Sequence, residues 1–533
     1  MEYIITEEDK SLVAQGSVDY KYRLYIVDSN KNVLDEIEGM SSIGNYNING
    51  DSEVRRVTSF TLLLDNYYMD KSIEKRLLFW IGYNFKLEIG IKSLRTDDFK
   101  WYECGYYTIT EGNTTYNATE NSITLNLSDF YSNLNGDRNG QVGGAPTIEI
   151  PIKDDNDNYF TIKQVTEGIL KDNGITDYIV DDIGEFYGMP QNNENYEEYR
   201  KNNPLWNKLP YDLKYDAACY VSDMLDEIKN LYPNCQMYFD IYGNFCFNMI
   251  PSCEYDPISL DDDFIQSVLV SDNTENVTYD IKNIKNVTEV FGQSYEIDRY
   301  ITDVNSSTNI YLASLDLYSE YVSGEFIAFI PNITNIGNMK ISINSLSPIP
   351  IYYEYTSDYI EPNLLEAGNT YVLKIGYTEN GYVAYYLGQY QPHALCVLSN
   401  DANDAKFTKD YFATKYNCDK KNVVIRIEKD SPFAVQKIGE VLDVKSGSDF
   451  DNILSDSVAK DNAIYYNRQS SSIYDTVNIS VKMIPFLDVN KKIEYRKQQE
   501  EDTHFYIVKS IDNNLDTCIS TISMYRFYPL YYN

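Results

Sequence analysis

The sequence predicts a mainly β protein with a minor α component, an α+β chain of several domains. Three observations predict this class. Short apolar–polar alternations separated by turn residues recur through residues 1–145 and again after residue 265. One amphipathic helix and an aromatic hairpin stand out within residues 211–252. The length of 533 residues exceeds what one hydrophobic core supports, so we expect roughly three or four domains.

Residues 1–145 predict an antiparallel β-barrel or sandwich, because regular short strands with turn chemistry between them are typical of those folds. The expected strands occupy residues 20–27, 43–49, 59–64, 85–91, 101–110 and 122–127. A Gly-rich stretch at residues 136–144 follows and marks a domain boundary.

Residues 146–265 predict a helix-plus-hairpin domain. Its clearest helix covers residues 216–231, and Pro233 ends it because proline cannot continue a helix. Two aromatic strands follow within residues 236–250, and Gly243 is free to take a positive φ in the turn between them. The apolar stripe of the helix has spacings of three, four and seven and consists of Ala217, Tyr220, Val221, Met224, Leu225, Ile228 and Leu231.

The same domain begins with less regular sequence. Residues 161–170 predict a short helix that ends near Gly174, and residues 185–206 are polar and rich in Tyr and Asn, which indicates a surface loop.

β character returns after residue 265. We assign residues 266–299 and 446–533 to a second β-barrel domain that also contains a helix, and residues 300–445 to an inserted β-sandwich. The expected elements of the second barrel are a strand pair at residues 276–280 and 284–292, a helix at 453–467, and strands at 475–483, 484–493, 506–511 and 518–528.

The net charge excludes some partners. The chain has 45 basic and 81 acidic residues, a formal charge of −36. Stable binding to nucleic acid or to anionic membranes requires clustered Lys and Arg, so we expect neither. The 52 Tyr are far above an ordinary share, and tyrosine suits sheets and half-buried contact surfaces.

The eight cysteines show no C-x-x-C spacing, so neither a zinc site nor a thioredoxin motif is predicted. We expect Cys219, in the predicted helix, and Cys246, in a strand, to be small buried apolar residues. The Met1 end lacks a basic and then apolar segment, and no window reaches about 18 apolar residues, so we expect no secretory signal and no membrane span.

Catalytic motifs are absent from the sequence. The two histidines, His393 and His504, have no Ser, Cys or metal-site motif around them, and we interpret His504, which precedes a predicted strand, as a surface or hydrogen-bonded residue. Carboxylate pairs carry no information in a chain with 81 acidic residues. We predict no catalytic, cofactor-binding or metal-binding residue and no enzyme activity.

Two acidic turns invite a calcium interpretation. Asp154, Asn156 and Asn158 match the first three ligand positions of an EF-hand loop. The sixth position is Tyr159 instead of Gly and the twelfth is Val165 instead of Glu, so we interpret this stretch as an acidic turn, with calcium as the minor alternative. The same interpretation applies to residues 261–263.

Several phrases, in this order, resemble the hub proteins of the tail tip or baseplate of tailed bacteriophages, in the form found in phages of Firmicutes. They are Gly105-Tyr-Tyr-Thr-Ile, residues 123–129, the helix and hairpin ending at Pro251, residues 484–493, and the ending Met524-Tyr-Arg-Phe-Tyr-Pro-Leu530. The resemblance covers roughly three quarters of the chain, all except the insertion.

This resemblance implies a homotrimeric structural protein of the virion. Each protomer would contribute two similar tube-type barrels, so that the trimer matches a hexameric tail tube and forms the conduit for genome ejection. The implied partners are the tail tube or distal-tail ring, the tape-measure protein and a tail spike or tip protein, with a host-surface glycan as a candidate ligand of the insertion. The implied location is the tail tip or baseplate, after synthesis in the cytoplasm of the host bacterium. Because the sequence ends directly after the closing strand, we expect any cell-wall cleavage to come from another protein.

Two alternatives stay open at this point. Tyr-rich β domains also suit a secreted or surface carbohydrate-binding or carbohydrate-degrading protein. A different tail component, such as a distal-tail or receptor-binding protein, would share the barrel but not the helix-plus-hairpin domain.

Overall fold

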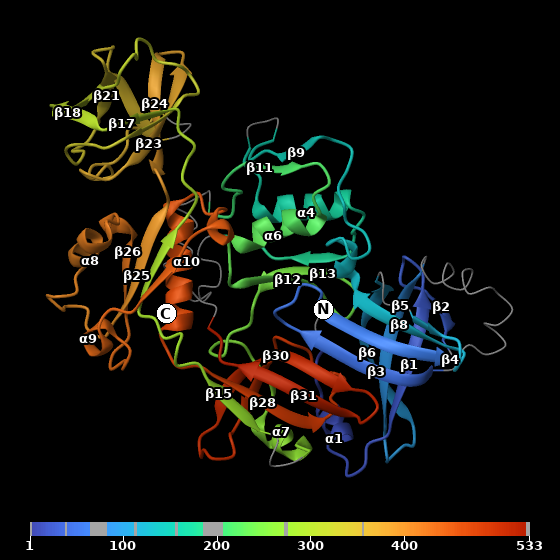
Figure 1. The fold of residues 1–533 in the computed structure, drawn as a ribbon. Coiled ribbons are helices and arrows are strands. Elements are labelled where there is room, and N and C mark those ends of the chain that lie inside the picture. Colours follow the sequence, from blue (N-terminus) through green and yellow to red (C-terminus); the bar gives the residue numbers. More distant parts are fainter. Residues whose placement is uncertain are drawn as a thin grey trace.

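The computed structural model describes residues 3–37, 40–63, 83–110, 115–154, 158–184, 206–270, 275–353 and 357–528 (Figure 1). Within these residues the strands form five sheets, of which one has fourteen strands and bends into a nearly closed barrel-like surface. The predicted mainly β class with minor α content is confirmed.

The N-terminal β unit begins with a helix that the sequence analysis missed, α1 (Glu7–Val13). Thr6 and Asp9 cap this helix reciprocally, a pairing that satisfies free backbone N–H groups of the first turn. The strands that follow are β1 (Tyr20–Val27), β2 (Val33–Glu36), β3 (Met40–Asn49), β4 (Arg56–Leu63), β5 (Asn84–Lys92), β6 (Phe99–Ile109), β7 (Thr115–Asn117) and β8 (Ser122–Asp129), before the 3-10 helix η1 (Phe130–Asn133).

The C-terminal β unit is continuous with the N-terminal one. Its elements are β14 (Ile258–Leu260), α7 (Asp262–Val268), β15 (Asn276–Tyr279), β28 (Asp475–Lys482), β29 (Lys492–Tyr495), β30 (His504–Asn514) and β31 (Ile519–Tyr525). The strands expected in two separate barrels belong to one sheet, because β3 pairs with β4 on one side and with β30 on the other. The main path of that sheet runs β15-β28-β31-β30-β3-β4-β8-β6-β5-β1-β2.

The helix-plus-hairpin domain covers β9 (Thr147–Ile150), α4 (Ile162–Asp172), β10 (Tyr178–Val180), β11 (Leu213–Asp216), α6 (Val221–Asn230), β12 (Cys235–Phe239) and β13 (Phe245–Met249). The predicted hairpin is confirmed, and Gly243 in its turn has φ +72°. The loop predicted at residues 185–206 lies, except for Trp206, outside the described residues.

The start predicted for the main helix was wrong. Residues up to Asp216 pair as β11 with β9, and Ala218 has a φ of +69°, which a right-handed helix does not allow. Helix α6 therefore begins at Val221, and Cys219 precedes it instead of lying in it. The buried face of the true helix keeps only the later members of the predicted stripe: Val221, Met224, Leu225 and Ile228.

A four-stranded sheet corrects the prediction for residues 300–445. It contains β16 (Val287–Phe291), β25 (His393–Ser399), β26 (Val423–Ile427) and β27 (Leu442–Lys445), with α8 (Lys409–Tyr416), η2 (Lys420–Asn422), α9 (Val435–Ile438), η3 (Ser448–Phe450) and α10 (Asp456–Ser470) around it. Thus the last part of the expected insertion pairs with β16, a strand that precedes the insertion. The expected strand pair at residues 276–280 and 284–292 was wrong, because β15 pairs with β28 in another sheet.

The remaining insertion forms a separate eight-stranded sheet, which projects from the rest of the molecule (Figure 1). Its strands are β17 (Arg299–Ile301), β18 (Asp303–Ser307), β19 (Ile310–Ser314), β20 (Phe326–Phe329), β21 (Lys340–Ile343), β22 (Ile349–Tyr353), β23 (Tyr371–Thr378) and β24 (Gly381–Gln389). The domain boundaries as a whole stay a prediction.

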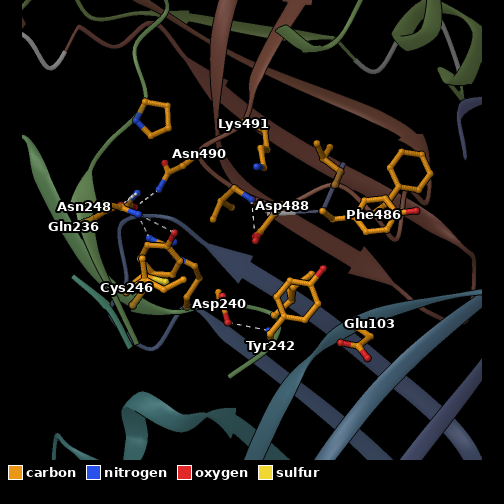
Figure 2. A pocket seen from close by; sticks show the side chains of 18 of the residues that line it. Glu103, Gln236, Asp240, Tyr242, Cys246, Asn248, Phe486, Asp488, Asn490 and Lys491 are labelled. Carbon is orange, nitrogen blue, oxygen red and sulfur yellow. Dashed lines mark hydrogen bonds between the residues drawn. The ribbon is translucent and has the colours of Figure 1, made fainter. Parts of the chain in front are cut away.

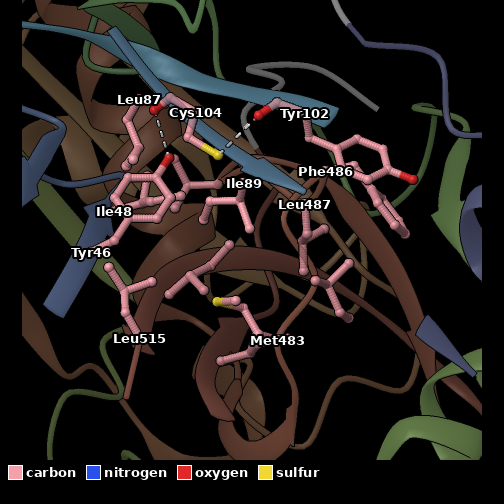
Figure 3. Close-up of a cluster of buried hydrophobic side chains, with 14 of the residues drawn as sticks. Tyr46, Ile48, Leu87, Ile89, Tyr102, Cys104, Met483, Phe486, Leu487 and Leu515 are labelled. Atoms are coloured by element: carbon pink, nitrogen blue, oxygen red, sulfur yellow. Dashed lines mark hydrogen bonds between the residues drawn. The ribbon is translucent and has the colours of Figure 1, made fainter. Parts of the chain in front are cut away.

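The largest hydrophobic core joins the two β units (Figure 3). Ile48 and Leu87 of the N-terminal unit and Met483 of the C-terminal unit are buried in one cluster. The segment from residue 484 to the start of β29 was predicted as a strand, but it is a loop whose Phe486 and Leu487 insert into this cluster. Burial of these side chains stabilises the loop in place of strand pairing.

Candidate functional site

Three distant segments of the chain meet at a cavity of about 580 Å³. Strand β6 contributes Tyr102 and Glu103, the β12–β13 hairpin contributes Gln236 and Tyr242, and the loop before β29 contributes residues 485–491 (Figure 2). The cavity therefore lies where the helix-plus-hairpin domain contacts both β units.

Arg56, at the start of β4, links the N-terminal unit to the hairpin and to the loop before β29. Its backbone N–H donates to Asp129 Oδ2 at 2.9 Å, its Nη1 donates to the carbonyl oxygen of Phe239 at 2.6 Å, and its Nη2 pairs with Asp488. The side chain is 1% exposed. Burial alone would lower the pKa of Arg56, but the negative charge of Asp488 raises it overall, so the guanidinium stays protonated.

Asp129, at the end of β8, is the buried carboxylate beside the two arginines. It accepts the backbone N–H groups of Arg56 and Tyr131. Burial raises the pKa of Asp129 to about 6, because desolvation of the charged form outweighs these hydrogen bonds.

Arg55 lies next to Arg56 and faces the cavity. Its Nη2 donates to Gln236 Oε1 at 2.6 Å, and its guanidinium carbon lies 3.6 Å from the centre of the Tyr238 ring. Gln236 also accepts a hydrogen bond from Asn490 Nδ2 and donates to Asn248 Oδ1 at 3.0 Å. One amide thus connects the N-terminal unit, the hairpin and the closing loop.

A second polar contact joins the N-terminal unit to helix α6. Lys229 pairs with Glu53 and lies 3.0 Å from Asp226. Burial, and then the hydrogen bond with Glu53, raises the pKa of Asp226 to about 7. Burial acts to raise the pKa of Glu53 as well, but its hydrogen bond with Asp226 and the charge of Lys229 lower it overall.

The histidines are held by carboxylates. His393 Nε2 lies 2.8 Å from Glu289 Oε1, both side chains are buried, and the imidazole stacks on Phe291 with the ring centres 4.2 Å apart. His504 Nε2 lies 2.9 Å from Glu500 Oε2. His504, interpreted from the sequence as a surface or hydrogen-bonded residue, is hydrogen-bonded in the structure.

The acidic turns are closed by their own hydrogen bonds. Asp154 accepts the backbone N–H of Asn158 at 2.9 Å, while Asn156 lies outside the described residues. Asp261 caps α7 and pairs with Lys10, and Asp262 accepts the N–H of Arg496. Among the residues that the structure describes, no group of three His, Cys, Asp or Glu side chains could hold a metal ion.

Sequence analysis missed Arg55 and Arg56. The available signal was two adjacent arginines directly before a strand, in a chain where acidic residues outnumber basic ones. Adjacent residues of a strand point to opposite faces, so such a pair has to place at least one charge toward the interior or an interface.

The fourteen-stranded sheet leaves two different edges. Strand β2 pairs with β1 alone and β15 with β28 alone among the described strands. All four residues of β2 are exposed, including Leu34 at 51%, and Tyr279 on β15 is 50% exposed. Exposed edges with apolar side chains are where another chain can add strands.

Comparisons with known proteins give one family match and several similar folds. A family model described as a domain of unknown function (DUF5048) matches residues 430–531. The comparison with curated proteins gave no match.

Three solved structures cover nearly the whole chain. The 43 kDa tail protein of prophage MuSo2 from Shewanella oneidensis has 7% identity and a TM-score of 0.42, with 95% of this chain and 98% of that chain covered. The tail protein from Neisseria meningitidis MC58 has 6% identity and a TM-score of 0.43, with 96% and 98% covered. Prophage tail protein gp18 from Listeria monocytogenes EGD-e has 8% identity and a TM-score of 0.40, with 95% and 94% covered.

All three structures are described as tail proteins, two of them from prophages. Among the helices of the described residues, none is long and apolar enough to span a membrane.

Proposed function

We propose that this chain is a structural component of a phage tail, and that it forms the trimeric hub at the tail tip or baseplate. The observation that supports this most directly is the pairing of β3 with both β4 and β30, which places the N- and C-terminal β units side by side in one sheet. Three protomers of this kind would present six β units to a hexameric tail tube.

The open sheet edges suit such a ring. A closed ring of identical subunits uses heterologous contacts, in which one surface of a protomer meets a different surface of the next. Strands β2 and β15 end the main sheet path at its two edges and carry exposed apolar side chains. We propose that these edges contribute to the contact between protomers.

The proposed ring would be a conduit that does not retain DNA. Duplex DNA carries about one negative charge per 1.7 Å, and a basic wall would bind it through counterion release. With a formal charge of −36, the chain favours a neutral to acidic wall. Clustered Lys and Arg on the channel surface of an assembled ring would contradict this part of the proposal.

The eight-stranded sheet is the part we propose for contact with a host-surface glycan. It carries close tyrosine pairs, Tyr352 with Tyr359 at 4.8 Å and Tyr377 with Tyr382 at 4.9 Å between ring centres. Tyr377 is 67% exposed. Aromatic faces beside hydroxyl groups are suited to stacking on sugar rings.

Oligomeric state tests the hub proposal. We expect light scattering and averaged electron micrographs of the full chain, mixed with its tube partner, to give a threefold ring. Leu34→Asp should abolish the ring, because it places a charge in the proposed contact, while the far-ultraviolet circular dichroism stays unchanged.

The control is Leu317→Asp, which changes a fully exposed leucine in the eight-stranded sheet region and should leave the ring intact. A wild-type chain that stays monomeric at high concentration and with its tube partner would refute the trimeric hub. A ring that survives Leu34→Asp would refute only the edge contact.

A further inference from the structure

Arg55 is a buried guanidinium without an anionic partner. It is 3% exposed, and in the part of the chain that the structure describes it forms no salt bridge with a carboxylate. The groups that its guanidinium contacts are neutral, namely the amide oxygen of Gln236 at 2.6 Å and the ring of Tyr238 at 3.6 Å. The carboxylates of Asp488 and Asp129 act on it without forming an ion pair. Within the described residues its Nε has no hydrogen-bond partner.

Burying such a residue costs free energy. Arginine stays protonated in proteins, and a buried charge that lacks a counterion loses its hydration without electrostatic compensation. Burial lowers the pKa of Arg55 overall, because desolvation outweighs the opposing effects of Tyr238, Asp488 and Asp129, whereas the charge of Asp488 raises the pKa of Arg56 overall. A bound anion at this position would recover the lost interaction.

Four of the five carboxylates that line the cavity, Glu103, Asp240, Asp256 and Asp488, have identified donors, and the fifth is Asp181. Asp488 pairs with Arg56, and Glu103 pairs with Lys86 at 2.5 Å. Asp240 accepts the backbone N–H groups of its turn, and Asp256 accepts that of Ser252. These four acids are therefore held in place by other groups and do not neutralise Arg55 directly.

The cavity has room and chemistry for an outside ligand. Its volume of about 580 Å³ lies within the range of sites for small ligands. One end gathers Gln236, Asn248, Asn490 and Lys491, and the other end is walled by Tyr242 and Phe486 (Figure 2).

We propose that this cavity is a binding site for a carboxylate attached to an apolar or aromatic group. The planar guanidinium of Arg55 would bind the carboxylate, since its N–H groups match the two oxygens of such an anion. Lys491 and the amide of Asn490 lie at the same end, and the aromatic wall receives the apolar group. This site is independent of the proposed trimeric assembly.

A pair of probes that differ only in charge tests the site. N-acetyl-L-tyrosine carries a carboxylate and an aromatic ring, and N-acetyl-L-tyrosinamide replaces the carboxylate with a neutral amide. In NMR titrations of the full chain we expect the acid to bind roughly tenfold or more tightly than the amide, which corresponds to one charge-assisted hydrogen-bonding contact.

Variants then locate the carboxylate. Arg55→Gln should remove the difference between the two probes, and Arg55→Lys should retain part of it because a point charge remains. The matched control is Arg95→Gln, at an exposed arginine that does not line the cavity, which should behave as the wild type. Circular dichroism and gel filtration establish that each variant is folded.

Three results would overturn the proposal: equal affinity of the wild type for acid and amide, no binding of the acid, or an unchanged preference in folded Arg55→Gln. If Arg55→Gln does not fold, the comparison of the two probes on the wild-type chain decides. Tail-ring assembly is measured separately, so failure of one proposal leaves the other standing.

Discussion

Replacing Arg56 with alanine should uncouple the three segments that meet at the central cavity. The substitution leaves the Asp488 carboxylate without its guanidinium and removes the donor to the carbonyl oxygen of Phe239. Both interactions cross from β4 to other segments, so their loss weakens the contact between the N-terminal unit, the hairpin and the closing loop.

The magnitude follows from burial. Removing one partner of a buried ion pair costs about 3–5 kcal/mol, because the other charge stays behind unpaired. The Arg56 side chain is 1% exposed but that of Asp488 is 25% exposed, so water solvates part of the abandoned carboxylate. We therefore expect a loss of about 3 kcal/mol in the free energy of unfolding, at the lower end of the range.

Urea denaturation followed by circular dichroism and tyrosine fluorescence measures this loss. The double variant Arg56→Ala with Asp488→Asn should be less destabilised than the sum of the single variants, by about 1–3 kcal/mol, because the pair is coupled. The control is Lys509→Ala, which breaks the exposed 2.8 Å pair with Asp51 and should cost less than about 1 kcal/mol. A cost for Arg56→Ala no larger than that of Lys509→Ala, or additive single effects, would refute the reasoning.

Three further outcomes follow from the same structure. The pKa of Asp129 is raised from 3.8 to about 6 by burial, so the unfolded chain ionises first and stability falls as pH rises from about 4 to 6. Over this range the free energy of unfolding falls by at most about 3 kcal/mol. Asp129→Asn should flatten that part of a plot of urea midpoint against pH, and an unchanged plot would show that other groups cause the dependence. Gly243→Ala should lower the free energy of unfolding by about 1–2 kcal/mol and so lower the melting temperature, since Gly243 has a φ of +72° and the new Cβ would lie 3.2 Å from Phe130. An unchanged melting curve would contradict this backbone strain. Finally, the purified chain should not hydrolyse peptidoglycan, glycan or peptide above background. Turnover that disappears with His393→Gln or Glu289→Gln would overturn the structural assignment of that pair.

The sequence by itself determined the elements that depend on local order. Alternation along the strand from residue 475 predicted β28, whose residues alternate between buried and half-buried along its whole length. The hairpin around Gly243 could also be predicted locally, since aromatic strands on both sides of a glycine that can adopt positive φ are typical of a hairpin turn.

Prediction from local sequence failed where contacts with distant segments decided the secondary structure. Residues 216–220 fit the helical stripe, but Asp216 pairs with β9 and Ala218 has a φ of +69°, so the helix begins only at Val221. Residues 484–491 have strand-like composition, yet burial of Phe486 and Leu487 against the other β unit made them a loop.

The candidate site belongs wholly to the tertiary structure. Arg55 and Arg56 lie more than 180 residues from the hairpin that they contact and more than 430 from Asp488. Their adjacency before a strand was the one local signal, and it could not show that both are buried, since loss of hydration depends on which segments cover them. The sequence therefore determined which strands and turns could form, and the packing of three distant segments decided which charges became buried and which one was left facing a cavity.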